Sequence, residues 1–357
     1  MRSLVVSAAV AALALAPIHP HVSYKQHNLV SDGFVPADFN DPNLVNSWGL
    51  APNPTGIWWV ANAETGTSTL YDQNGVADSL IVSIPSTGGP GTQGEPTGIV
   101  FNPTTDFVVT DGTNSGAAAF LFAGEDGVIS GWSPAVPPPP PSTQAFVAVD
   151  NSASGAIYKG LALAVTRHGN FLYATDFHNG RIDAFDGQFN PVFVGKFVDP
   201  TLPAGYGPFG IAFLKEKIYV TYAKQDANAE DDVPGAGFGF IDVFSANGKF
   251  VRRLVSNAEL NAPWGLALAP SDFIGFGDQL VVGNFGDGRI NVYDPIDGRH
   301  RGLLKEADGT PIAVDGLWGL AFGNGGAAGP TNVLFFTAGP DDEAHGLFGR
   351  FDVTIGT

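Results

Sequence analysis

Four oxygen-bearing side chains stand directly after short apolar segments of this 357-residue chain and could share one piece of chemistry. They are Asn62, Asp111, Asp176 and Asn284. Carboxylate and amide oxygens that converge on one point suit Ca²⁺, which takes roughly six to eight oxygen ligands. Side chains of this kind at a strand end also cap the following turn by bonding its backbone. The turn chemistry favours capping, and a calcium site is the alternative.

Two histidines, His178 and His345, suggest a second kind of chemistry. Histidine titrates near neutral pH and binds zinc, so these two residues are candidates for a Zn²⁺ or general-base site. The carboxylates that could complete this site are Asp176, Asp341, Asp342 and Glu343. A third zinc ligand is not evident, and a solvated role in loops is favoured for both. The sequence has no serine-nucleophile motif, phosphate-binding loop or dinucleotide fingerprint. Whether the chain is an enzyme is therefore left open.

Aromatic residues occupy a third set of recurring positions, either just before a glycine or at a strand end. They are Trp48, Tyr222, Trp264 and Trp318. At a channel mouth such rings would stack on a sugar or an aromatic ligand. Packing between neighbouring repeats is the favoured role, because large aromatic side chains dominate the energetics of cores.

The elements that must position these residues belong to a pattern that recurs six times. A polar or aromatic residue is followed by Gly, an aliphatic residue and Ala or Val. The six glycines are Gly49, Gly98, Gly160, Gly210, Gly265 and Gly319. Their spacing of roughly 50 to 60 residues suits one four-stranded sheet per repeat. We therefore predict an all-β fold, a six-bladed β-propeller with four strands in each blade.

The remaining strands of each repeat are expected at regular positions. Second strands are predicted at residues 57–61, 107–110, 171–175, 218–222, 280–283 and 333–337. Fourth strands are predicted at residues 80–84, 145–149, 191–198, 249–255 and 299–305. The sixth repeat lacks a fourth strand, whereas a spare strand at 24–32 precedes the first repeat. We predict that this N-terminal strand completes the last blade and closes the ring, which removes exposed sheet edges.

One segment interrupts the regular repeat. The acidic, glycine-rich insertion at residues 224–239 falls between the second and third strands of the fourth repeat. Loops of this length inside a compact domain are often functional. It is a candidate lid over one face of the ring.

The charge balance limits the partners of this protein. The formal net charge is −18, with 17 Lys and Arg against 35 Asp and Glu. This argues against nucleic acid and anionic membranes, which select for basic surfaces. Solubility explains the acidity most simply, and attraction for cations such as Ca²⁺ is the alternative. The chain has no cysteine, so disulfides and thiol chemistry are excluded.

The N-terminus has the form of a signal peptide. Arg2 precedes a largely apolar run over residues 4–15, and the small-residue sequence 14–16 follows. This run of about 12 residues is too short to span a bilayer. We predict a leader at 1–22, a single propeller domain at 23–357, export to the periplasm or outside, and no membrane span after signal removal.

Several segments resemble NHL-type propeller repeats, most clearly residues 173–182 and 281–290. Residues 27–32 and 43–51 are similar to an uncharacterised family of secreted bacterial propellers. The resemblance covers roughly residues 24–353 and implies the fold. The wider group contains both binding scaffolds and enzymes, and propeller lactonases and phosphotriesterases hold a central calcium.

Two functions are compatible with this sequence. The first is an exported scaffold that binds a small molecule, a glycan or a protein on its channel face, because six regular repeats carry no convergent acid–base set. The second is a metal-dependent, lactonase-like hydrolase or lyase with a cation in the central channel. The first is favoured by a narrow margin.

Overall fold

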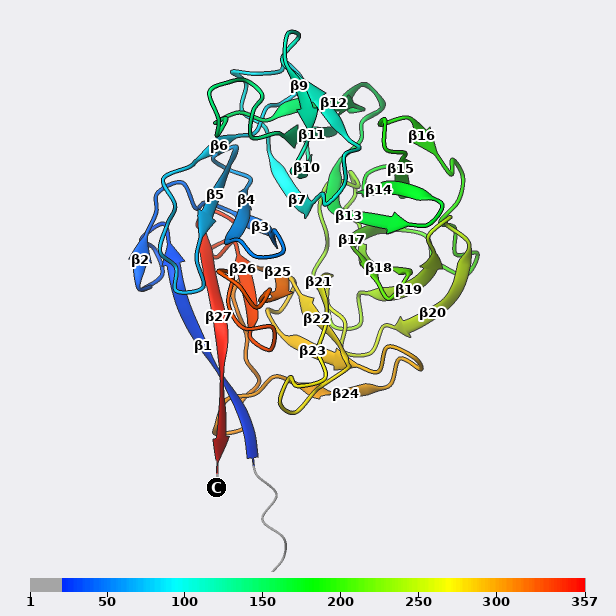
Figure 1. Ribbon diagram of the computed structural model, residues 1–357. Helices are drawn as coiled ribbons and strands as arrows, with labels where there is room; N and C mark the ends of the chain where they lie inside the picture. Colours follow the sequence, from blue (N-terminus) through cyan, green and yellow to red (C-terminus); the bar gives the residue numbers. More distant parts are fainter. Residues whose placement is uncertain (1–20, 357) are drawn as a thin grey trace, which may run out of the picture.

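The computed structural model describes residues 21–356 and forms a ring of six β-sheets around a central axis (Figure 1). This confirms the predicted six-bladed β-propeller. The one helix among the described residues is the short 3-10 helix Ser152–Ser154. The predicted signal peptide lies almost entirely outside the described residues, and strand β1 begins at His21. No helix within residues 21–356 is long and apolar enough to cross a membrane.

In each blade four antiparallel strands lie side by side, with the first strand nearest the axis and the fourth at the rim. Blade 1 contains β3 (Ser47–Pro52), β4 (Trp58–Asn62), β5 (Thr67–Tyr71) and β6 (Val82–Ser83). Blade 2 contains β7 (Pro96–Phe101), β10 (Phe120–Gly124), β11 (Val128–Trp132) and β12 (Phe146–Asp150). Blade 3 contains β13 (Tyr158–Thr166), β14 (Gly169–Asp176), β15 (Arg181–Phe185) and β16 (Pro191–Val192).

The other three blades follow the same plan. Blade 4 contains β17 (Tyr206–Leu214), β18 (Lys217–Lys224), β19 (Phe240–Ser245) and β20 (Phe250–Ser256). Blade 5 contains β21 (Pro263–Leu268), β22 (Leu280–Asn284), β23 (Ile290–Tyr293) and β24 (His300–Leu303). Blade 6 contains β25 (Leu317–Phe322), β26 (Leu334–Ala338), β27 (Leu347–Gly356) and β1 (His21–Ser31), with β2 (Phe39–Asn40) added at its edge.

The alternating strand directions give the ring two distinct faces. Connections from second to third strands, and from each blade to the next, lie on one face, which we call the loop face. Turns from first to second and from third to fourth strands lie on the other, which we call the turn face. The insertion at residues 224–239 between β18 and β19 lies on the loop face.

The repeat glycines bring neighbouring innermost strands into backbone contact. A Cβ added to Gly49 would lie 2.7 Å from the Thr97 carbonyl oxygen of the next blade. A Cβ on Gly160 would lie 2.7 Å from the Phe209 carbonyl oxygen. Pairing between the two inner strands also shifts register beside this glycine in all six blades. Glycine is therefore required where one blade packs on the next.

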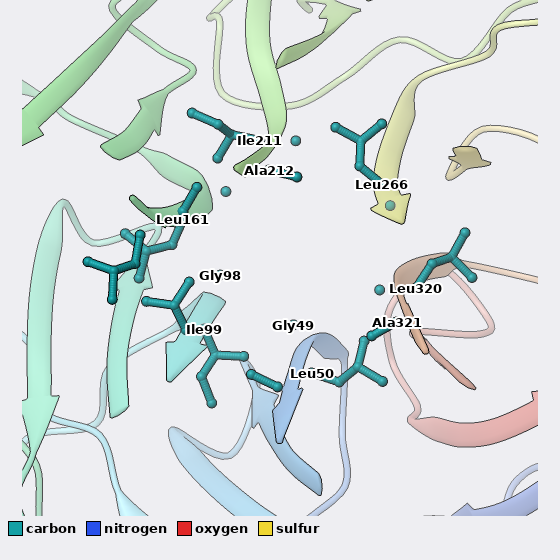
Figure 2. Close-up of a pocket in the computed structure, with 18 of the residues that line it drawn as sticks. Gly49, Leu50, Gly98, Ile99, Leu161, Ile211, Ala212, Leu266, Leu320 and Ala321 are labelled. Atoms are coloured by element: carbon teal, nitrogen blue, oxygen red, sulfur yellow. The ribbon is translucent and has the colours of Figure 1, made fainter. Parts of the chain in front are cut away.

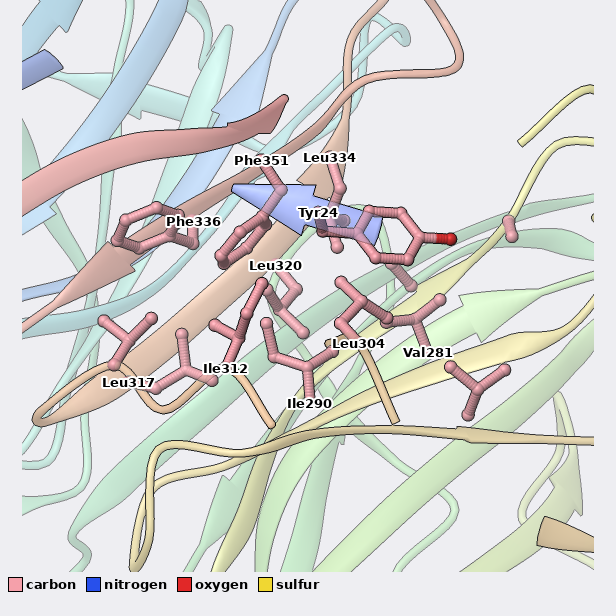
Figure 3. Packing of buried hydrophobic residues seen from close by; sticks show 14 of the residues in the cluster. Tyr24, Val281, Ile290, Leu304, Ile312, Leu317, Leu320, Leu334, Phe336 and Phe351 are labelled. Atoms are coloured by element: carbon pink, nitrogen blue, oxygen red, sulfur yellow. The ribbon is translucent and has the colours of Figure 1, made fainter. Parts of the chain in front are cut away.

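The N-terminal strand closes the ring as predicted. Strand β1 pairs antiparallel with β27 from His21 opposite Gly356 to Ser31 opposite Leu347. The two strands form a long ribbon that extends beyond the rim (Figure 1). Tyr24 on β1 packs into a core cluster of blades 5 and 6, and its hydroxyl donates to the Ile274 carbonyl oxygen at 2.5 Å (Figure 3).

Blade 2 differs from the prediction. Residues 107–110 were expected as its second strand, but β8 (Val108–Thr110) pairs only with β9 (Ser115–Ala117). The strand that pairs with β7 is β10, at Phe120–Gly124. The β8–β9 hairpin is thus an insertion, and it packs near the outer strand β12. The short run at residues 107–110 is rich in β-branched and apolar residues, which is typical of any strand, so it does not reveal which partner the strand has.

Candidate functional site

Five charged side chains gather where the axis opens on the loop face. We call them the channel mouth: Glu125, Lys159, Asp231, Asp232 and Glu343. The carboxylates come from the loops between second and third strands of three alternate blades, blades 2, 4 and 6. Lys159 lies near the start of β13, the innermost strand of blade 3. Loops from three blades and one strand of a fourth therefore converge on one point near the axis.

Lys159 is the only cation of the channel mouth, and it is almost completely buried. Its ammonium pairs with the Glu125 carboxylate and lies 3.3 Å from Asp231 Oδ1. Burial by itself would lower the pKa of Lys159, but the carboxylates of Glu125 and Asp231 outweigh burial and raise it. The side chain therefore stays charged at neutral pH and does not act as a nucleophile.

Two carboxyl groups of the channel mouth titrate near neutral pH. Burial raises the pKa of Glu343 to about 7, against the hydrogen bond that Asn46 Nδ2 donates to its Oε2 at 2.7 Å. Burial also raises the pKa of Asp232 to about 7, although Lys159 lowers it. One Asp232 oxygen is buried without a hydrogen-bond partner among the described residues. The net charge of the mouth therefore becomes more negative as pH rises through 7.

Beneath the channel mouth lies a buried cluster of aromatic rings, which we call the aromatic plug. It contains Trp48, Phe177, Phe209, Trp264 and Trp318. Trp48 and Trp318 stack with ring centroids 3.4 Å apart, and Trp264 meets both edge-on. The Lys159 ammonium lies 5.4 Å from the Trp48 ring centroid. The three tryptophans are buried, so they fill the space between blades, which is the role that the sequence favoured.

Past the aromatic plug, the axis continues as a hollow of about 340 Å³. Figure 2 shows its wall, to which each innermost strand contributes a glycine and aliphatic side chains such as Leu50, Leu161 and Leu320. Trp264 lies among its lining residues, where the plug ends. Among the described residues, no charged side chain lines this hollow. The polar chemistry of the axis is thus concentrated at the loop face.

The predicted oxygen ligands hydrogen-bond separately, each within its own part of the ring. Asn62 bonds Ser47 and Thr69 of blade 1 at 3.1 Å and 2.9 Å. Asp176 accepts from Asn179 Nδ2 at 2.8 Å and lies 3.1 Å from the Arg181 guanidinium. Burial raises the pKa of Asp176.

The other two predicted ligands also serve local turns. Asn284 donates to the Glu259 carbonyl oxygen at 2.8 Å and to Asp287 at 3.1 Å. Asp111 lies at the exposed tip of the β8–β9 hairpin and accepts from Thr113 N at 2.7 Å. From the sequence, Asp111 was expected after the second strand of blade 2. In the structure it follows β8, which pairs with β9 and not with the strands of that blade. Within residues 21–356, no three His, Asp or Glu residues are placed to hold a metal ion.

The remaining candidates are also dispersed. The Nδ1 atom of His345 lies 2.6 Å from Asp32 Oδ2, and its ring stacks on Phe34 with centroids 3.8 Å apart. His178 lies in a loop of blade 3, where its Nδ1 is buried without a partner among the described residues. Tyr222 is buried in a core cluster between blades 3 and 4. The structure does not bring the two histidines together.

The sequence did not reveal the channel mouth as a whole, although it pointed to Glu343 as a candidate zinc or general-base residue. The carboxylates of the mouth lie in loops outside the repeated pattern, so their spacing carries no periodic signal. A second signal was the acidic insertion at 224–239, which supplies Asp231 and Asp232 beside Lys159. This insertion lies on the loop face, and its role as a lid stays a prediction.

Comparisons with known proteins identify relatives but not an activity. No protein-family model matches this sequence. Two uncharacterized proteins of Acanthamoeba polyphaga mimivirus are 36% identical over 335 residues and 34% identical over 337 residues. The matches cover 92% of this chain and 80% and 85% of the viral proteins. This chain belongs to their family.

The solved structures extend the likeness in fold. Virginiamycin B lyase of Staphylococcus aureus superposes with a TM-score of 0.52, covering 93% of this chain and 99% of the lyase. Its sequence is 13% identical, so the likeness shows the propeller fold alone. The two family members reported above are viral, and the secreted, bacterial character suggested by the sequence stays a prediction.

Proposed function

We propose that this protein is a binding scaffold whose channel mouth takes a small organic cation on the loop face. The observation that carries this proposal is the excess of carboxylates over ammonium groups there. Glu125, Asp231, Asp232 and Glu343 surround Lys159 alone. A second cationic group would find charge-assisted hydrogen-bond acceptors that Lys159 does not satisfy.

The surroundings of the channel mouth favour such a ligand. The Lys159 ammonium lies over the buried Trp48 and Phe177 rings of the aromatic plug, which hold this cation in place. The loops that carry the carboxylates are anchored on rigid blades, which keeps the acceptors in place before a ligand arrives.

Calorimetric titration with 1,4-diaminobutane tests this proposal. The wild-type protein should bind the diamine more tightly at pH 8 than at pH 6, because Asp232 and Glu343 ionise near pH 7. Glu343→Gln should weaken binding at pH 8 at least fivefold, whereas Glu306→Gln, on an exposed loop, should not. Equal binding of neutral 1,4-butanediol would sink the proposal.

Export is part of the same proposal and rests on the N-terminal sequence alone. Arg2, the apolar run and the small residues at 14–16 support a cleaved leader. N-terminal sequencing of the protein recovered outside the cytoplasm of an expressing bacterium should show the leader removed. Recovery of the uncleaved chain from the cytoplasm would contradict it.

A second candidate is a hydrolase or lyase at the same mouth. The observation that favours it is the pKa of about 7 for Asp232 and Glu343, which suits general acid–base catalysis. The calcium site stays a prediction, because the structure does not bring its four proposed ligands together: Asn62, Asp111, Asp176 and Asn284. Metal analysis of the purified protein, with Asp176→Ala as the variant, tests it. Turnover of lactones or esters that Glu343→Gln abolishes would favour the enzyme.

A further inference from the structure

A second, larger hollow lies on the turn face, between blades 3 and 4. Its volume is about 840 Å³, within the range of roughly 300 to 1,000 Å³ that is usual for small-molecule sites. Three turns form its sides: β13–β14, β17–β18 and β19–β20. It lies on the opposite face from the channel mouth, so nothing in its argument rests on the function proposed above.

The floor of this hollow is aromatic. Phe171, Phe193 and Phe213 line it, and each is only half-buried. The rings of Phe171 and Phe193 lie with centroids 5.0 Å apart and tilted by 53°. Three phenylalanine faces that stay open to solvent in one concave site would gain free energy by covering a flat apolar group.

Phe193 holds an unusual backbone conformation at this floor. Its φ is +54°, in the left-handed region that a bulky side chain rarely adopts. Such strain costs on the order of 1 kcal/mol or more and tends to cluster at ligand sites. The Phe193 ring packs against Phe171 in the hollow.

Two side chains of opposite charge lie on different turns of the rim. Arg167 lies in the β13–β14 turn and Glu216 in the β17–β18 turn, and both side chains are exposed. Among the described residues neither forms an ion pair, and Arg167 Nε bonds only His168 Nε2, at 2.9 Å. The guanidinium can pair with a carboxylate of a bound molecule, and the carboxylate can pair with an ammonium of the same molecule.

We propose that this hollow binds a small aromatic zwitterion, of the class of a free aromatic amino acid or an aromatic dipeptide. The ring lies on the three phenylalanines. The carboxylate of the ligand pairs with Arg167, and its ammonium pairs with Glu216. The two rim charges select a molecule that carries both signs, and the aromatic floor selects a flat apolar side chain.

Calorimetric titration of the full-length Glu343→Gln protein with three matched probes tests this site, because this variant weakens the cation binding proposed for the channel mouth, where 2-phenylethylamine could otherwise bind. L-Phenylalanine carries both charges, phenylacetate lacks the ammonium, and 2-phenylethylamine lacks the carboxylate. L-Phenylalanine should bind at least fivefold more tightly than either of the others, because each of them leaves one rim charge without a partner. Equal binding of all three, or no binding of L-phenylalanine, would overturn the proposal.

Two exposed substitutions assign the charges without threatening the fold. Arg167→Gln should weaken L-phenylalanine binding to the level of 2-phenylethylamine and leave the binding of 2-phenylethylamine unchanged. Glu216→Gln should do the same with phenylacetate as the reference. Arg299→Gln and Glu306→Gln, in exposed segments of blade 5, are the matched controls and should change nothing. All of these substitutions are made in the Glu343→Gln background, and loss of L-phenylalanine binding in either control would contradict the assignment.

Discussion

Individual residues at the channel mouth are held in protonation states that bulk water would not give them. Glu343 and Asp232 are buried near other carboxylates, and each keeps its proton up to about pH 7. Lys159 stays charged because Glu125 and Asp231 offset the cost of its burial. The mouth is thus nearly neutral in mild acid and strongly acidic in mild base.

This arrangement predicts how stability depends on pH. A carboxyl whose folded-state pKa lies above its unfolded value stabilises the fold below the unfolded pKa and loses that effect as pH rises through 7. Wild-type protein should therefore lose about 2 kcal/mol between pH 5 and pH 8 through Glu343. Urea unfolding of wild type and Glu343→Gln across this range measures the effect. A variant whose stability falls as steeply as that of wild type would contradict it.

The sequence revealed part of this chemistry. It pointed to the loop face, to the insertion at 224–239 and to the packing role of Trp48 and its partners. It did not reveal the pairing of Lys159 with Glu125, because two residues 34 positions apart meet only after two blades have formed. Asn62 and Asp176 were identified as strand-end residues, but their spacing cannot tell a turn cap from a metal ligand.

At the scale of elements, the blades are positioned by contacts between backbones. The Thr175 hydroxyl of blade 3 donates to the Phe209 carbonyl oxygen of blade 4 at 2.7 Å, and the Gly160 amide donates to the same hydroxyl at 2.7 Å. Thr337 makes the corresponding contact with the Trp48 carbonyl oxygen where blade 6 meets blade 1. The repeat glycine leaves the space that these contacts need.

A methyl group at this position should force neighbouring blades apart. Gly160→Ala would place its Cβ 2.7 Å from the Phe209 carbonyl oxygen, so we expect a loss of about 1–3 kcal/mol in the free energy of unfolding. Gly309→Asn is the control, because no atom lies within 4 Å of its Cβ position and asparagine tolerates its φ of +88°. Denaturant titration compares them; equal stability of the two variants would refute the backbone-contact explanation.

The order of elements was predictable for five blades and misread in one. In five blades the innermost strand carries the glycine pattern and the second strand is the next strand in the sequence. The order of strands in the sequence is therefore their order in the sheet. In blade 2 the strand β8 of the inserted hairpin is as rich in β-branched residues as a blade strand. Only the pairing of β10 with β7, set by packing against the neighbouring blades, shows which segment belongs to the sheet.

For the whole molecule, the ring depends on joining the two ends of the chain. A missing fourth strand at one end and a spare strand at the other were enough to predict the closure. Strand β1 pairs with β27 along its length, and Tyr24 anchors it to blade 5. Without that strand, β27 would be an open edge and the ring would have a gap between first and last blades.

Locking this closure covalently should therefore stabilise the entire ring. Ser23 and Thr354 are Cα partners in the β1–β27 ribbon, and directly opposed residues in antiparallel strands lie within disulfide range. The chain has no cysteine of its own, so Ser23→Cys combined with Thr354→Cys can pair only with each other within one molecule. The oxidised double variant should gain about 2–4 kcal/mol over its reduced form in denaturant unfolding, because the crosslink restricts the unfolded chain. Each single variant should behave like wild type. An oxidised protein no more stable than the reduced one would mean that unfolding begins elsewhere and that the ribbon is not the closure on which the ring depends.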